Sequence, residues 1–338
     1  MEISATIAVM IFKDKTIFLN GGAGFMGSFL VEKLSEDNQL IVYDNFSAAI
    51  VDDTWLSQFP NTTVVHGDMR EKEKITEAMK GSDVVINLAA AHIRLSLTKP
   101  IEVHDVNTTG ILTSLMAAKH VGVKRFIYVS SSEIYGSATT KVLTETDSKD
   151  PTTVYGVSKY MGELYTEYFH AHEGLPTTIV RLFNTYGPRA HFEEVYGEVI
   201  PRMCIRALAG QTPLIFGSGE QTRDFTYITD TIAGLLLASQ EDTLVGDVIN
   251  IAYGEEVSIK RIAESICTNA GLTSGPRFLA DRPNDVMRHA ANTKKAQQLL
   301  GWKPEVSIED GIRTYMTWLK KTYPNPKELL TKIPERNW

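Results

Sequence analysis

The feature that most constrains this chain is a glycine-rich turn close to its N-terminus. A short β-branched and aromatic run, Thr16 to Phe18, leads into Leu19-Asn20-Gly21-Gly22-Ala23-Gly24-Phe25-Met26-Gly27, and a helical pattern follows. The three-residue spacing of Gly21, Gly24 and Gly27 suits a tight turn, close approach of backbone N–H groups to a phosphate, and close helix–strand packing. The order strand, turn, helix predicts a site for a pyrophosphate. A plain surface turn would use the same residues, so further signals are needed.

The next apolar run ends in a carboxylate. Leu40 to Asp44 has the composition of a buried strand, and Asp44 follows Gly24 by about twenty residues, where a dinucleotide-binding unit places its ribose ligand. A 2′-phosphate would meet like charge there, and no arginine follows in Asn45-Phe46-Ser47. We therefore predict NAD rather than NADP. The alternative, that Asp44 merely caps a turn, stays open.

Composition narrows the class of protein. With 338 residues, 43% of them hydrophobic, the chain is long enough for a nucleotide-binding domain and a smaller joined domain. A net charge of −7 without a Lys/Arg run argues against nucleic-acid binding, and no apolar stretch reaches the roughly twenty residues of a membrane span. The two cysteines, Cys204 and Cys267, stand far apart, so we expect no disulfide framework, no metal site and a cytoplasmic location.

Strand and helix patterns alternate from Lys15 to about Arg189. The candidate strands are 16–19, 40–44, 63–66, 84–88, 125–130 and 177–183, and the candidate helices are 28–36, 71–79, 101–121 and 155–173. The alternation predicts an α/β fold, a Rossmann doubly wound parallel sheet with a smaller C-terminal α/β substrate domain. Beyond it we expect helices 195–208, 229–239, 258–270, 293–300 and 308–320, with short strands 214–216 and 248–251 joining one sheet or another.

These patterns divide the chain into four parts. We assign 1–14 to an N-terminal extension, 15–189 to the NAD-binding domain, 190–322 to the substrate domain and 323–338 to a C-terminal tail. Past Thr322 the Pro-rich run is expected to end the regular structure. The helices 101–121 and 155–173 carry apolar residues on more than one face, which predicts a homodimer formed through a four-helix interface.

A tyrosine and a lysine four residues apart suggest acid–base chemistry. Tyr155-Gly156-Val157-Ser158-Lys159 opens a predicted helix, so the phenol and the ammonium lie one turn apart on one face. A free phenol has a pKa of about 10, and a nearby cation helps it act as a base near neutral pH. Tyr323 and Lys327 match the same pattern, but two prolines bar a regular helix there. Ser131, at the carboxyl end of the fifth strand, is expected to orient a substrate hydroxyl toward Tyr155.

With these motifs in this order, the chain resembles the extended short-chain dehydrogenase/reductases that modify nucleotide sugars, over residues 15 to 320. The resemblance implies an adenine contact at Asp68-Met69, a strand-end contact at Leu88-Ala89-Ala90, and a helix asparagine at Asn107. The cofactor-binding set predicted in this way is Gly21, Gly24, Phe25, Met26, Gly27, Asp44, Asn45, Asp68, Met69, Leu88, Ala89, Ala90, Asn107 and Lys159.

The second half of the chain supplies the predicted substrate contacts. Arg223 and Arg282 match the family's positions for a sugar diphosphate, and Asp285 matches a carboxylate for ribose hydroxyls. The resemblance adds Ser132 and Asn184 to this set. Taken one at a time, these arginines could instead form surface salt bridges. Further candidates for the sugar pocket are His92, Arg94, Ser96, His191 and Glu194, and base recognition is expected around 199–207 and 214–216.

The resemblance also implies the first step of the reaction. Tyr155 would take a proton from a sugar hydroxyl, most often at C4, while the ring hydrogen leaves as hydride to NAD. The 4-keto sugar is a branch point: reduction from the other face gives 4-epimerisation, and removal of the acidified C5 proton gives elimination or 5-epimerisation. Decarboxylation is a third exit.

Glu133 bears on this choice. Simple 4-epimerases of the family carry a small residue at this position, whereas 4,6-dehydratases and uronate decarboxylases carry glutamate. Ser132 departs from the aspartate of the dTDP-glucose dehydratases. We predict an NAD-dependent nucleotide-sugar epimerase/dehydratase with Tyr155, Lys159, Ser131 and Glu133 as catalytic residues. A simple UDP-glucose 4-epimerase-like enzyme, a uronate decarboxylase, a C4 dehydrogenase and a non-catalytic NAD-binding regulator remain alternatives, as does a merely structural Glu133.

Overall fold

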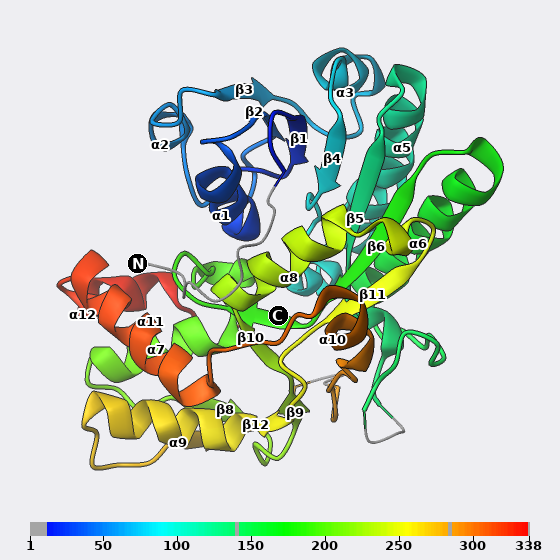
Figure 1. Ribbon diagram of the computed structural model, residues 1–338. Coiled ribbons are helices and arrows are strands. Elements are labelled where there is room, and N and C mark those ends of the chain that lie inside the picture. Colours follow the sequence, from blue (N-terminus) through cyan, green and yellow to red (C-terminus); the bar gives the residue numbers. More distant parts are fainter. Residues whose placement is uncertain (1–11, 139–141, 283–285, 337–338) are drawn as a thin grey trace.

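A parallel sheet of seven strands forms the centre of the molecule (Figure 1). The computed structural model describes residues 12–138, 142–282 and 286–336. The strand order is β11-β6-β5-β4-β1-β2-β3, and every neighbouring pair in the sheet is parallel. The strands are β1 (Thr16–Asn20), β2 (Gln39–Asp44), β3 (Thr62–His66), β4 (Val84–Asn87), β5 (Arg125–Ser131), β6 (Thr177–Leu182) and β11 (Val248–Ile251).

Helices cover both faces of this sheet. On β1, Phe18 packs with helices α3 (Lys72–Met79), α5 (Gly110–Val121) and α6 (Val154–Glu173), while its neighbour Ile17 packs with α1 (Phe25–Leu34) and α8 (Ile228–Gln240). Successive strand residues point to opposite faces, so a strand that is apolar on both sides must be covered twice. The predicted doubly wound α/β architecture is confirmed.

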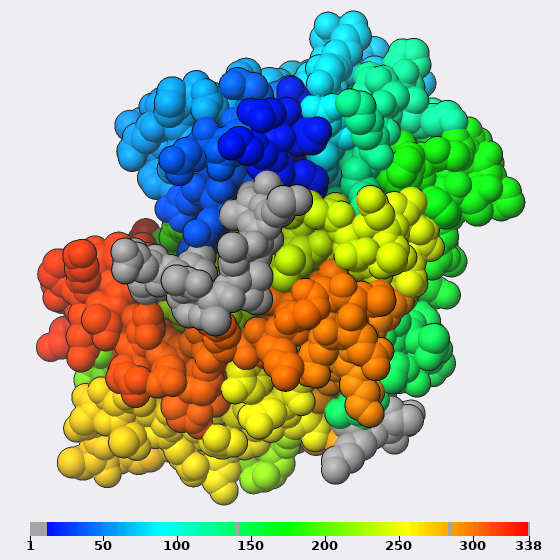
Figure 2. All heavy atoms as spheres, in the orientation of Figure 1, coloured from blue at the N-terminus to red at the C-terminus, as the bar shows by residue number. Residues whose placement is uncertain are grey.

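The residues after 189 build a second layer of structure beside the carboxyl ends of the strands and also return to the sheet. Four helices, α7 (Val199–Leu208), α9 (Ile259–Ala270), α11 (Ile308–Thr322) and α12 (Pro326–Leu329), pack together below the sheet in Figure 1. In Figure 2 the orange and red atoms of this part lie below the blue atoms of the first half. The short pairs β7–β10 (Asn184–Tyr186, Phe225–Tyr227), β8–β13 (Leu214–Phe216, Arg277–Leu279) and β9–β12 (Thr222–Arg223, Val257–Ser258) complete it. By contrast, α8 and β11 belong to the central layers.

The C-terminal tail corrects one expectation. Regular structure does not end at Thr322, because α12 begins at Pro326 and a 3₁₀ turn follows over Leu330–Lys332. Proline is tolerated at the first position of a helix, where its missing N–H would have no intrahelical partner. Leu329 and Ile333 are buried, so the tail is held by apolar contacts with the second layer.

Three helices also differ from their expected bounds. The run expected over 101–121 is α4 (Pro100–His104), a π-helical turn (Asp105–Thr109) and α5 in succession. The helix expected from residue 195 begins at Val199, after a 3₁₀ turn over Glu194–Tyr196. The first helix begins at Phe25 rather than residue 28. This earlier start places the helix N-terminus directly at the glycine turn.

The glycine turn is as tightly packed as its spacing predicts. Gly21 has φ +83°, and a Cβ on it would lie 2.7 Å from the backbone nitrogen of Ala89. A Cβ on Gly27 would overlap the carbonyl oxygen of Gly21 and lie 2.6 Å from the Cα of Gly22. A Cβ on Gly24 would meet only Gly21 O, at 3.4 Å. Gly21 and Gly27 therefore allow the close packing, while Gly24 keeps the end of α1 open.

We expect Gly27→Ala to lower the free energy of unfolding by about 1–3 kcal/mol, because the added methyl group overlaps backbone that cannot move independently. Gly275→Ala is the matched control, since a Cβ there meets no atom within 4 Å, and its effect should stay within about 0.5 kcal/mol. Urea unfolding of both variants measures the difference. Equal stabilities for the two variants would contradict the packing role of Gly27.

Candidate active site

A long groove runs along the carboxyl ends of the central strands, starting at the glycine turn. Gly24 is the N-cap of α1 and no side chain caps this helix, so backbone N–H groups of its first turn face the groove. All predicted cofactor residues except Asn107 line this groove. The predicted residues Ser131, Ser132, Glu133, Tyr155 and Asn184 line it as well.

Asp44 lies at the rim of the groove, held by backbone N–H groups. Its carboxylate accepts hydrogen bonds from Ala23 N at 3.0 Å and Phe46 N at 2.8 Å, and burial raises its pKa. Beside it, Asn45 Nδ2 donates to Asp68 Oδ2 at 3.0 Å. Hydrogen bonding from Arg70 holds the pKa of Asp68 at about 2, so this carboxylate stays ionised. The end of β2 is thus fixed to the glycine turn and presents carboxylates where a ribose would lie.

Asn107 does not line the groove. Its side chain is buried in the π-helical turn, where Oδ1 accepts from Ala91 N at 2.7 Å and Nδ2 donates to Ala91 O and Ser158 Oγ. The direct contact of Asn107 with the cofactor stays a prediction. The amide ties the segment after β4 to the helix that carries Tyr155 and Lys159.

Tyr155 and Lys159 lie in the first turns of α6, as predicted, and line the groove. Thr153 caps the helix by accepting from Gly156 N at 3.0 Å. Lys159 Nζ donates to Val129 O at 2.7 Å and lies 4.6 Å from the centre of the Tyr128 ring. Burial lowers the pKa of Lys159 to about 7, and Glu163 opposes this shift.

The groups around the Tyr155 phenol shift its pKa in opposite directions. Burial raises its pKa most, a hydrogen bond with Ser131 lowers it, and the carboxylates of Glu133 and Glu198 raise it. Ser131 Oγ also accepts from Glu133 N at 3.3 Å. Ser131 therefore connects the phenol to the turn that carries Glu133.

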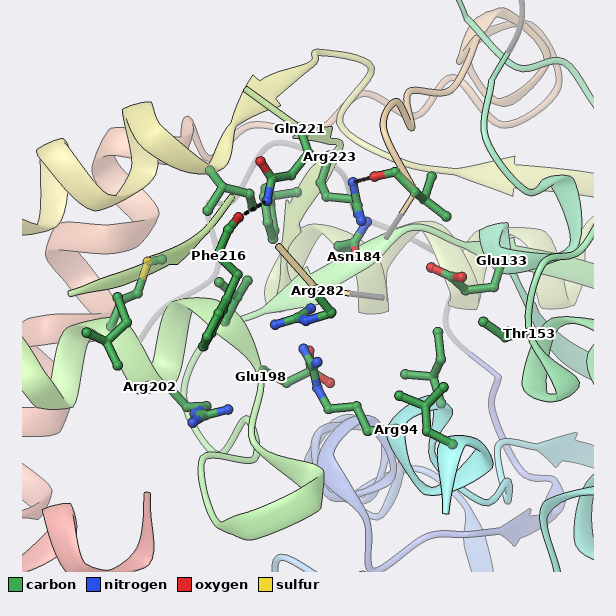
Figure 3. A pocket seen from close by; sticks show the side chains of 18 of the residues that line it. Arg94, Glu133, Thr153, Asn184, Glu198, Arg202, Phe216, Gln221, Arg223 and Arg282 are labelled. Atoms are coloured by element: carbon green, nitrogen blue, oxygen red, sulfur yellow. Dashed lines mark hydrogen bonds between the residues drawn. The ribbon is translucent and has the colours of Figure 1, made fainter. Parts of the chain in front are cut away.

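A second cavity, rich in arginine, adjoins the groove (Figure 3). Its guanidinium groups come from well-separated segments of the chain: Arg94, Arg202, Arg206, Arg223 and Arg282. Ile93, Glu133, Asn184 and Glu198 line both the cavity and the groove. The two spaces therefore form one continuous site that meets next to Tyr155. Arginine forks in such numbers suit the oxygens of a diphosphate.

The arginines are held by the second layer. Arg223 Nη1 donates to Thr222 O at 2.8 Å, and the Arg282 guanidinium lies 5.5 Å from the centre of the Phe216 ring. Asp224 accepts from the backbone nitrogens of Tyr253, Gly254 and Ala291. These bonds fix the strand end that carries Arg223. Asp285 lies outside the described residues.

The remaining sugar-pocket candidates differ in whether they line the groove or the second cavity. His92 and His191 line the groove and Arg94 the second cavity, whereas Ser96 and Glu194 line neither. Parts of 199–207 and 214–216 line the second cavity, and their role in base recognition stays a prediction. Sequence reasoning missed Thr153, Glu198 and Gln221. Glu198 falls inside the helix expected over 195–208, and that position gives no sign of a pocket residue.

A buried ion pair fixes this site to the sheet. Arg181 on β6 donates to both carboxylate oxygens of Glu163 on α6, at 2.9 and 2.7 Å. The same guanidinium donates to the Tyr135 hydroxyl at 2.6 Å and to Glu145 O at 2.9 Å. Both side chains of the pair are almost fully buried. This network joins the Tyr155 helix to the turn that bears Glu133.

The dinucleotide groove, the Tyr155–Lys159 helix and the arginine-rich cavity define an enzyme of the short-chain dehydrogenase/reductase class. Residues 18–315 match the family described as GDP-mannose 4,6 dehydratase. The chain therefore belongs to the extended nucleotide-sugar epimerase/dehydratase family of that class.

Three relatives show the range of this family. The Thermotoga maritima UDP-glucose 4-epimerase, solved with UDP-glucose, aligns with a TM-score of 0.86 at 31% identity and covers 91% of this chain and 99% of its own. The Streptomyces venezuelae dTDP-glucose 4,6-dehydratase, solved with NAD and TYD, has a TM-score of 0.85 at 27% identity and covers 91% and 98%. UDP-glucuronic acid decarboxylase 1 of Xenopus tropicalis is 31% identical, over 91% of this chain and 72% of that protein.

The described residues also bear on the expectations for membranes, metals and disulfides. Among the residues that the structure describes, no helix combines the length and apolarity needed to cross a membrane. Over the same residues, no group of three or more His, Cys, Asp or Glu side chains is arranged to hold a metal ion. Cys204 and Cys267 are both free and buried.

We expect Glu163→Gln to lower the free energy of unfolding by about 3–5 kcal/mol, because it leaves the Arg181 charge buried without its counter-ion. Glu77→Gln is the control: Glu77 pairs with Lys80 on the exposed face of α3, and exposed pairs contribute less than about 1 kcal/mol. Urea unfolding compares the two. A Glu163→Gln protein as stable as the control variant would rule out the proposed importance of the pair.

Proposed function

We propose that this enzyme oxidises a nucleotide sugar at C4 with bound NAD and then acts on the resulting 4-keto sugar at C5. The observation that carries the proposal is the junction of two spaces at one phenol. A groove suited to a dinucleotide and a cavity suited to a sugar diphosphate share Glu133, Asn184 and Glu198, and Tyr155 lies beside them. A sugar bound by its diphosphate in the arginine-rich cavity would reach the phenol.

The groove fits NAD. Gly24 leaves the N-terminus of α1 open for a pyrophosphate, and Asp44 and Asn45 stand where the adenosine ribose would lie. The carboxylate of Asp44 disfavours a 2′-phosphate, which supports NAD over NADP. When bound, NAD supplies a hydride acceptor for the sugar and a hydride donor for the final reduction.

Tyr155 is the proposed general base for the C4 hydroxyl. Its phenol is hydrogen-bonded to Ser131, which lowers its pKa and orients it toward the groove. Lys159 lies one turn further along the same helix, where its charge favours the phenolate. Burial destabilises both the phenolate form of Tyr155 and the ammonium form of Lys159. Tyr155 therefore acts as a base only when the charges around it favour its phenolate.

Glu133 is the proposed second acid/base. The Glu133 carboxylate lines both spaces, and its charge acts on Tyr155. It would therefore lie near the reacting carbons of a bound sugar. Removal of the C5 proton, which the adjacent ketone acidifies, would lead to elimination or 5-epimerisation. Simple 4-epimerisation is the second candidate, favoured by the similarity to the Thermotoga UDP-glucose 4-epimerase. It needs no base at C5.

We expect Tyr155→Phe to lower turnover at least about a hundredfold, because the variant lacks the group that takes the C4 proton. The measurement is product formation from a panel of nucleotide sugars. Tyr165→Phe removes another hydroxyl from α6, outside both spaces, and should leave turnover unchanged. Near-normal turnover by Tyr155→Phe would reject the assignment of the base.

A second experiment follows deuterium from the solvent. In deuterated water the wild-type enzyme should place deuterium at C5 of the product, and Glu133→Gln should abolish this incorporation while leaving C4 oxidation measurable. NMR of the product reads both positions. Incorporation that is unchanged in Glu133→Gln removes Glu133 from the C5 step, and its absence in the wild type favours a simple 4-epimerase.

The proposed assembly is a homodimer formed through α5 and α6. These helices are in contact and both expose large apolar side chains: Met116 on α5, and Val157, Leu164 and Tyr168 on α6. An apolar surface on two neighbouring helices fits a second copy of itself in a four-helix interface. The cytoplasmic location remains a prediction from cysteine usage.

Leu164→Lys is expected to convert the dimer into monomers by placing a charge in the buried interface. Sedimentation velocity at several concentrations measures the mass. Leu299→Lys introduces the same charge at an exposed leucine of α10 (Lys294–Leu300) and should not change the mass. A concentration-independent monomer mass for the wild type would contradict the proposed assembly.

A further inference from the structure

The charges around the substrate site are unevenly distributed. Five arginines line the second cavity, but none of them lines the groove. The two carboxylates of the cavity, Glu133 and Glu198, are found where the cavity and the groove meet. The diphosphate end of the site is therefore cationic, and the end next to Tyr155 carries acidic groups.

Glu198 is built into this junction rather than used by its own helix. It is the N-cap residue of α7, but its side chain accepts no capping hydrogen bond. Instead Oε1 lies 3.1 Å from His92 Nε2, and 38% of the side-chain surface remains exposed within the site. His92 Nδ1 accepts from Arg94 N at 3.4 Å, which leaves the ring proton on Nε2 to be donated to Glu198.

The surroundings keep Glu198 ionised. Burial alone would raise its pKa, but His92, Arg94 and His191 act in the opposite direction and the net shift is downward. Glu198 and Glu133 both line the junction and both raise the pKa of Tyr155, so both carboxylates lie beside the phenol at which the sugar would react. Arg94 also acts on Glu198 and favours its ionised form.

We infer that Glu198 determines the class of sugar: it selects an uncharged hexose, whose hydroxyl groups donate hydrogen bonds to the carboxylate, and rejects a hexuronate. A uronate would bring a third carboxylate to the junction, and like charges at close range are costly in a partly buried site. The inference rests on the proposed function. Of the reactions found among the relatives, it leaves for this enzyme those whose sugar carries no carboxylate.

Equilibrium binding tests this selectivity without requiring turnover. Isothermal titration of the full chain with UDP, UDP-glucose and UDP-glucuronate gives three dissociation constants, and division by the value for UDP isolates the effect of the sugar. We expect wild type to bind UDP-glucose at least tenfold more tightly than UDP-glucuronate. Glu198→Gln should reduce this ratio at least fivefold, mainly by strengthening the binding of UDP-glucuronate.

The matched control is Glu193→Gln, which removes a carboxylate five residues away that pairs with Lys332 on the surface at 2.8 Å. It should leave the ratio unchanged. Glu198→Ala provides a second variant, and thermal unfolding checks that each variant is folded. Equal binding of both sugars by wild type, or an unchanged ratio in both Glu198 variants, overturns the inference.

Turnover of the same two sugars separates this inference from the proposed function. Selective binding of UDP-glucose without any reaction would refute the proposed chemistry and leave the selectivity standing. Reaction of UDP-glucuronate at a rate similar to that of UDP-glucose would refute the selectivity and leave the chemistry standing. Binding of UDP together with failure of both UDP sugars to bind would overturn both.

Discussion

The active site depends on one buried ion pair, Arg181 with Glu163. Removing two charges from water is costly, and the cost is offset only where geometry and further hydrogen bonds are good. Here the guanidinium contacts both carboxylate oxygens and also donates to Tyr135 and Glu145. Glu163 follows Lys159 by one helical turn, and Tyr135 follows Glu133 by two residues. The Arg181 side chain on β6 therefore positions both the segment with Tyr155 and Lys159 and the turn with Glu133.

Around this pair the fold separates two binding tasks. The central sheet and the N-terminus of α1 provide a groove for a dinucleotide, and the second layer provides arginines for a diphosphate. Both anionic ligands would therefore approach Tyr155 from cationic or N–H-rich surroundings. The carboxylates Glu133 and Glu198 stand between them, so the sugar is the part of the substrate that meets negative charge.

Much of this arrangement was predictable because it follows from local sequence. The alternating strands and helices, the glycine turn and Asp44 all act through residues close in the chain, and the structure places each where expected. Local sequence predicted less where distant contacts decide. The tail after Thr322, which was expected to be irregular, folds because Leu329 and Ile333 pack on the second layer. The amide of Asn107 bonds to Ala91 and Ser158, partners that its own sequence neighbours do not indicate.

The sequence alone determined the fold class, the dinucleotide groove and the Tyr155–Lys159 pair, since these depend on periodicity and on spacings within one turn or one helix. Only the tertiary structure decided that Glu198 is a pocket residue. Its neighbour His92 lies 106 positions earlier in the chain, and nothing in the sequence at residue 198 indicates which way a carboxylate before a helix will point. That direction is set by the packing of α7 against the rest of the molecule, which local sequence does not encode.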